Sequence, residues 1–141
     1  MHKVGAILAY DILKNMGLPL QECVEIMIAI GNHDEGTGNA VSEISAALIL
    51  ADKSDVHRKR VRKTNINTFD IHDKVNYAVE ESNLIIDNEK RKIILDLVID
   101  TGICPVLDYF EIFMDRTIMS KRAANFLNIW FELVINGTKL L

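Results

Sequence analysis

The 141-residue chain is poor in the residues that mark several special classes of protein, with two cysteines, two prolines and seven glycines. Cys23 and Cys104 are too few for a disulfide framework, and their apolar neighbours indicate reduced core residues. So little proline and glycine excludes a collagen-like or linker-dominated chain. No apolar run reaches the roughly 18 residues of a membrane span. No signal-peptide cleavage pattern follows the first apolar run, so we expect a cytoplasmic protein without a membrane partner.

The charge balance argues against nucleic acid as the partner of the whole chain. Sixteen Lys and Arg residues face 20 Asp and Glu residues, for a net charge of -4. One short run is nevertheless basic and contains Arg58, Lys59, Arg60, Arg62 and Lys63. This run is either a solvated charged face or a phosphate-facing patch. Because no aromatic residue interleaves its charges, a nucleic-acid site is disfavoured.

Residues 1–56 have the pattern of a helical half. Apolar residues recur at three- and four-residue steps in 3–16, 20–30 and 40–53, which predicts three helices. The stretch 31–39 is rich in Gly, Asn and Asp and predicts a turn. These helices have little polar surface, and about fifty residues cannot cover them on more than one side. We therefore expect additional cover from upstream sequence, a partner chain or a homo-oligomer, in preference to an apolar ligand.

Residues 57–70 have the composition of a basic connector, and residues 71–141 predict a small sheet with one helix. The apolar period changes from helical to two near Val75. The pattern then predicts a first strand, followed by a turn at 87–90 and a second strand at 93–99. A long helix at 105–127 and a last strand at 129–135 complete the prediction. The predicted fold class is α+β, with a helical half followed by a β-β-α-β antiparallel sheet.

Three residues in separate segments could carry chemistry. His2 begins the first predicted helix, His33 lies in the turn after the second, and Asp52 lies near the end of the third. Short connections place His2 and His33 at the same end of the helices, whereas Asp52 joins them only if the Gly-rich turn reorients the chain. Imidazole and carboxylate together suit a divalent metal. The alternative is a turn histidine and a solvated, helix-ending aspartate.

Three segments resemble, in order, elements of the HD-superfamily metal-dependent phosphohydrolases. The string His2-Lys3-Val4-Gly5-Ala6 is similar to the family's H-x-x-x-G/A element. Residues 30–36, which contain His33, resemble the histidine-bearing loop. Residues 46–55 resemble the helix that carries the final metal-binding aspartate, here Asp52. The rest of the chain resembles the C-terminal part of a clostridial-type group of these phosphohydrolases.

This resemblance implies a helical metal site that hydrolyses phosphate esters, often of nucleotides. It implies that a divalent metal (Fe, Mn or Mg) is bound by His2, His33 and Asp52. The substrate would be a phosphate-containing small molecule, held by Asn32, Lys53 and Arg58. Lys53 offers a charge and Arg58 a bidentate guanidinium.

The chain departs from the family pattern in two respects. Asn32 stands where the di-iron branch has a second histidine. The family's upstream histidine and paired His-Asp are not present, and neither His33-Asp34 nor His72-Asp73 substitutes for them. We therefore expect the C-terminal portion of an HD phosphohydrolase. It is either a hydrolase or a catalytically incomplete remnant that acts as an oligomerisation or ligand-binding module.

Overall fold

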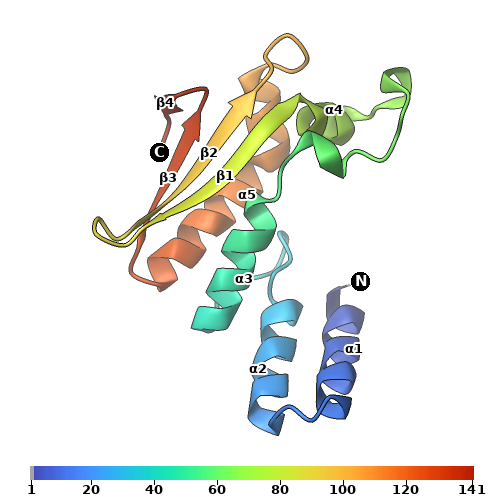
Figure 1. Ribbon diagram of the computed structural model, residues 1–141, viewed down its shortest axis with the longest axis vertical. Coiled ribbons are helices and arrows are strands. Elements are labelled where there is room, and N and C mark those ends of the chain that lie inside the picture. Colours follow the sequence, from blue (N-terminus) through green and yellow to red (C-terminus); the bar gives the residue numbers. More distant parts are fainter. Residues whose placement is uncertain (1) are drawn as a thin grey trace.

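The computed structural model describes residues 2–141, with side chains from residue 3 onward. The helices that come first are α1 (His2–Asn15), α2 (Leu20–Gly31) and α3 (Glu43–Ser54), followed by the 3₁₀ turns η1 (Arg58–Arg60) and η2 (Ile66–Thr68). The remainder comprises α4 (Ile71–Ala78), β1 (Val79–Asp87), β2 (Lys92–Ile99), α5 (Val106–Phe126), β3 (Trp130–Ile135) and β4 (Thr138–Lys139) (Figure 1). The predicted order of helices first and a sheet second is confirmed. No helix within 2–141 has both the length and the apolar character needed to cross a bilayer.

The four strands form one sheet in the order β1-β2-β3-β4. The outer pairs are antiparallel, but β2 and β3 are parallel, with Lys92 opposite Trp130 and Leu97 opposite Ile135. The prediction of an antiparallel sheet is therefore wrong for the central pair. The reason is α5, which carries the chain back along the sheet before β3 begins. Parallel neighbours need a long crossover of this kind, whereas antiparallel neighbours can be joined by a tight turn.

The segment that begins the sheet-containing half is helical, contrary to the strand predicted from Val75. Asp70 and Asp73 form a capping box, in which each side chain accepts a hydrogen bond from the other residue's backbone N–H. Val75 and Ala78 then lie three residues apart on the buried side of α4. A short apolar alternation fits a helix as well as a strand, and the capping box favours the helix.

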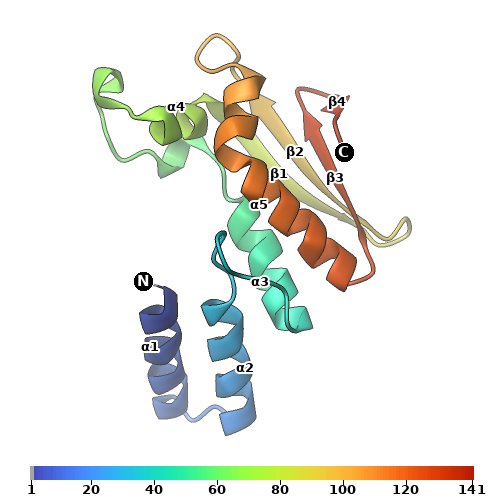
Figure 2. The same cartoon turned by 180° about the vertical axis from the view of Figure 1, so that it is seen from behind.

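The main core lies between one face of the sheet and the helices α3 and α5 (Figure 2). Alternate residues of the two central strands are buried: Ile93, Leu95, Leu97 and Ile99 on β2, and Phe131, Leu133 and Ile135 on β3. The predicted burial of both cysteines, without a disulfide, is confirmed. Burial, together with the neighbouring Asp108, raises the pKa of the Cys104 thiol to about 11, so it packs as a neutral side chain.

The Gly-rich segment 32–42 reverses the chain between α2 and α3. The Gly38 N–H donates to the Asp34 carbonyl at 2.7 Å, and a Cβ at Gly38 would collide with the backbone oxygens of Asn32 and Asp34. Only glycine can make this close approach. The segment therefore lies beside the C-terminal end of α3, where Glu35 is 3.4 Å from Lys53. This is the reorientation on which the predicted position of Asp52 depended.

Helix α3 begins at a serine cap, which gives a direct test of its stability. The Ser42 hydroxyl accepts a hydrogen bond from the Ser45 backbone N–H at 3.1 Å. Replacing Ser42 with alanine removes this bond, and we expect the free energy of unfolding to fall by about 1 kcal/mol. Urea denaturation followed by circular dichroism measures the change. Ser42→Asp keeps a good cap and should retain the stability, and an unchanged midpoint in Ser42→Ala would contradict the prediction.

Candidate functional site

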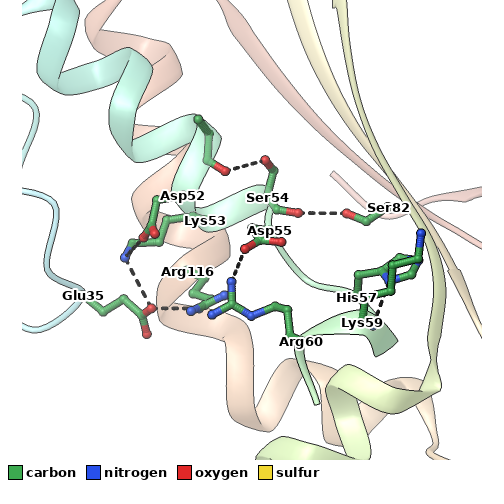
Figure 3. Close-up of polar contacts among 11 residues, drawn as sticks. Glu35, Asp52, Lys53, Ser54, Asp55, His57, Lys59, Arg60, Ser82 and Arg116 are labelled. Carbon is green, nitrogen blue, oxygen red and sulfur yellow. Dashed lines mark hydrogen bonds and ion pairs between the residues drawn. The ribbon is translucent and has the colours of Figure 1, made fainter. Parts of the chain in front are cut away.

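Charged side chains from three distant parts of the chain meet at the C-terminal end of α3 (Figure 3). Glu35 comes from the segment 32–42, Lys53 from the last turn of α3, and Arg116 from α5. The Glu35 Oε1 atom accepts a hydrogen bond from Arg116 Nε at 2.7 Å and lies 3.4 Å from Lys53 Nζ. Lys53 Nζ also donates to Asp52 Oδ2 at 2.6 Å. We call Glu35, Asp52, Lys53 and Arg116 the charged cluster.

The two cations of this cluster are more buried than the two anions. The Lys53 and Arg116 side chains are 4% and 15% exposed, whereas those of Asp52 and Glu35 are 38% and 35% exposed. A buried charge is costly unless it is paired, so the two carboxylates stabilise the cations in this position. The pairing is incomplete, because Arg116 Nη1 is buried without a hydrogen-bond partner among the described residues.

The carboxylate of Asp52 is held in its ionised form. Partial burial by itself would raise its pKa, but the hydrogen bond from Lys53 and the charges of Lys53, His33 and Arg116 together outweigh that effect. The pKa of Asp52 is therefore below its usual value, and the group is an anion at neutral pH. An anionic carboxylate oxygen is one of the two kinds of donor that the sequence analysis predicts for a divalent metal, the other being an imidazole.

The ring of His33 is oriented by the end of α2. Its Nδ1 atom is hydrogen bonded to the Ile30 carbonyl, and because a carbonyl only accepts, the ring proton is on Nδ1. In the neutral ring the lone pair is then on Nε2. Metal-ligating histidines are commonly fixed by such a bond from the other ring nitrogen to a backbone carbonyl. The charge of His33 lowers the pKa of Asp52, so the ring is near enough to influence that carboxylate.

The side chain of His2, the third predicted metal ligand, lies outside those that the structure describes. Its backbone begins α1. Ala6, one turn further on, lies 3.9 Å from the position of a Cβ built on Gly31 at the end of α2. Helices α1 and α2 run antiparallel as neighbours (Figure 2). The start of α1 and the loop that carries His33 are therefore at the same end of this hairpin, as short connections predict.

Among the described residues, His33 and Asp52 offer donor atoms of the kind that bind a divalent metal. His33 Nε2 and Asp52 Oδ1 have suitable chemistry, while Asp52 Oδ2 is hydrogen bonded to Lys53. Within residues 3–141, no three His, Cys, Asp or Glu side chains gather closely enough to hold an ion. A complete shell would need donors beyond these two.

Of the three predicted substrate-binding residues, Lys53 alone is in the charged cluster. The Asn32 side chain donates to the Ile28 carbonyl at 2.8 Å and so turns back onto α2. Arg58 donates to Glu80 at 2.8 Å, and its guanidinium lies 5.3 Å from the centre of the Tyr77 ring. These contacts direct Arg58 toward β1 and α4.

Two other residues of the basic run 58–63 also form ion pairs with carboxylates. Arg60 is paired with Asp55 (Figure 3), and Lys63 is paired with the two capping residues of α4, Asp70 and Asp73. All of these groups except the partly buried Asp73 are well exposed, and exposed pairs contribute little to stability. The contacts favour a solvated charged face over a phosphate-facing patch for this run.

Arg116 is the site residue that sequence reasoning missed. Its guanidinium lies 4.8 Å from the centre of the Phe113 ring, and Phe113 and Met119, three residues to either side, are both buried. The available signal was its position, since an arginine flanked at helical spacing by apolar core residues lies at the border of the buried face. Pairing with Glu35 could not be predicted, because the two residues are far apart in the chain.

Comparisons of the chain with family models, curated proteins and solved structures found no match. The functional argument therefore depends on the residues and their geometry.

Proposed function

We propose that the charged cluster, together with His33 and His2, forms the metal- and phosphate-binding side of an HD-type phosphohydrolase that acts on a phosphate ester or nucleotide. One observation carries the proposal. Two largely buried cations, Lys53 and Arg116, converge on a single side-chain oxygen next to an ionised Asp52. Such convergence of cations is the chemistry that a phosphate group requires.

Lys53 and Arg116 would hold the phosphate. Lysine supplies a compact charge and arginine a planar fork of donors, and both suit phosphate oxygens. At present both contact Glu35 Oε1, which thus marks a position where an anionic oxygen is accepted. Glu35 is on a loop and partly exposed, whereas the cations are on helices and largely buried. A phosphate could therefore replace the carboxylate without moving the cations.

Asp52, His33 and His2 are the proposed metal ligands. A bound divalent metal would lower the pKa of a coordinated water toward ~7 and neutralise phosphoryl charge. Asp52 contributes an oxygen that stays anionic, because the hydrogen bond from Lys53 stabilises its charge. His33 contributes Nε2, fixed by the bond of Nδ1 to Ile30.

Metal content is the direct test of this proposal. Elemental mass spectrometry of the purified chain should find near-stoichiometric Fe, Mn or Mg. His33→Ala and Asp52→Ala should lose that metal, because each removes one donor. Glu81→Ala, which changes an exposed carboxylate on β1, serves as the matched control and should keep it. If the unmodified chain neither contains metal nor, after incubation with these ions, hydrolyses p-nitrophenyl phosphate, the proposal is wrong.

A second function, oligomerisation, is favoured by exposed apolar side chains on α1, α2 and the turn between them. Each is at least 40% exposed: Val4, Ile7, Leu8, Ile12, Met16, Leu20 and Ile28. Large apolar patches on protein surfaces commonly mark interaction sites. If this surface joins two copies, sedimentation equilibrium should show a dimer that Ile7→Glu dissociates and Ile86→Glu, on β1, does not. A chain that stays monomeric at all concentrations would exclude self-association.

A further inference from the structure

Trp130 is on the face of the sheet opposite α5. It begins β3 and pairs with Lys92 of β2, and its side chain is 74% exposed. The next residue, Phe131, points into the core. Trp130 is the only tryptophan of the chain. An indole ring left open on a sheet offers a flat surface on which another ring can stack.

A hollow of about 510 Å³ lies beside this indole. Its walls include Lys90 of the turn between β1 and β2, Lys92 of β2, Glu132 of β3 and Lys139 of β4. We call it the Trp130 hollow. Its volume is within the range of sites that bind small organic molecules. It is built from strands and turns, whereas the charged cluster is built from α3, α5 and the segment 32–42.

Lysines give the Trp130 hollow an excess of positive charge. Glu132 accepts hydrogen bonds from Lys92 at 3.0 Å and from Lys139 at 2.8 Å, so one carboxylate positions two ammonium groups. These bonds hold the pKa of Glu132 below its usual value, and the arrangement persists at neutral pH. Lys90 adds a third cation, 3.8 Å from Asp87 and 71% exposed.

We propose that the Trp130 hollow binds a mononucleotide, with the base stacked on Trp130 and the phosphate held by Lys90, Lys92 and Lys139. Two observations carry this inference together, since the ring alone would suit any apolar ligand and the lysines alone any anion. A nucleotide has both a planar ring and a phosphate. Stacking of a base on an aromatic side chain requires no particular base, so the hollow itself does not select one. The proposal is independent of the phosphohydrolase proposal, because the two sites share no residue.

Tryptophan fluorescence of the full chain provides the test. Because Trp130 is the only indole, a saturable change in emission on titration with AMP reports occupancy of the Trp130 hollow. Adenosine lacks the phosphate, and we expect it to bind at least about tenfold more weakly. By calorimetry, ribose 5-phosphate, which lacks the base, should also bind at least about tenfold more weakly than AMP.

Variants separate this site from the charged cluster. Lys139→Ala should weaken AMP binding several-fold, while Lys14→Ala, which removes an exposed lysine of α1, should not. Arg116→Met should leave the fluorescence titration unchanged even if it abolishes hydrolysis. Trp130→Ala, followed by calorimetry, should lose about 5- to 100-fold in affinity.

Three results would overturn the inference. The first is the absence of a saturable fluorescence change up to millimolar AMP. The second is equal affinity in Lys139→Ala and Lys14→Ala. The third is binding of a single-stranded oligonucleotide without binding of AMP, which would make this face a nucleic-acid surface.

Discussion

Replacing Arg116 with methionine is expected to lower the rate of the proposed phosphate ester hydrolysis by about a hundredfold or more. Arg116 is one of the two cations that converge on Glu35, and its charge is the weakest of the influences that set the pKa of Asp52. Methionine keeps an unbranched apolar stem against Phe113 while removing the charge and all the donors. We therefore expect kcat/KM for p-nitrophenyl phosphate to fall while the metal content, by elemental mass spectrometry, is unchanged.

Two further variants make this result specific to phosphate binding. Arg116→Lys keeps the positive charge but loses the planar fork, and its activity should lie between those of the methionine variant and the unmodified chain. Arg122→Met removes an exposed arginine from the same helix and should have no effect. Full activity in Arg116→Met, with normal unfolding by urea, would exclude Arg116 from substrate binding.

Replacing Leu133 with alanine is expected to lower the free energy of unfolding by about 3 kcal/mol. Leu133 is fully buried on β3, opposite Leu95 of the neighbouring strand. The substitution removes apolar contacts and leaves a cavity between the sheet and its helices. Since domains of this size are stable by only about 5–15 kcal/mol, the loss is a large fraction of the total. Urea denaturation measures it.

The adjacent residue supplies a matched control for this prediction. Val134 is on the same strand but points to the opposite, partly exposed face. Val134→Ala should therefore cost less than about 1 kcal/mol. Equal losses in the two variants would contradict the orientation of β3 in the sheet.

Long periodic segments were predictable from the sequence. The predicted helix at 105–127 is observed as Val106–Phe126, and the predicted strand at 93–99 as Lys92–Ile99. In both segments, the spacing of the apolar residues matches the side that is buried in the structure, and the residues at the ends mark where the element begins and ends. The direction of strand pairing was not predictable in the same way, because an alternating pattern specifies which face is buried and not which way the neighbour runs.

The candidate site was predictable only in part. Asp52 was predicted from its position at the end of an apolar helix, and Lys53 from the site that the family resemblance implies. Arg116 gave only the weaker signal of its position at the border of a buried face, and Glu35 gave none. Their proximity results from the packing of α3 on α5 and from the reversal at Gly38. The HD-type metal site stays a prediction, which the metal measurement tests.

The parallel pairing of β2 with β3 has a consequence for how the chain folds. The β1–β2 hairpin is local in sequence, but the central pair forms only after the whole of α5 has closed the intervening loop. Closing such a loop costs chain entropy before any contact compensates for it, and non-local pairing slows folding. During synthesis, Ile49 and Leu50 of α3 and the inner face of β2 therefore leave the ribosome before β3 exists to complete their core. We expect the slowest folding phase to be the docking of β3.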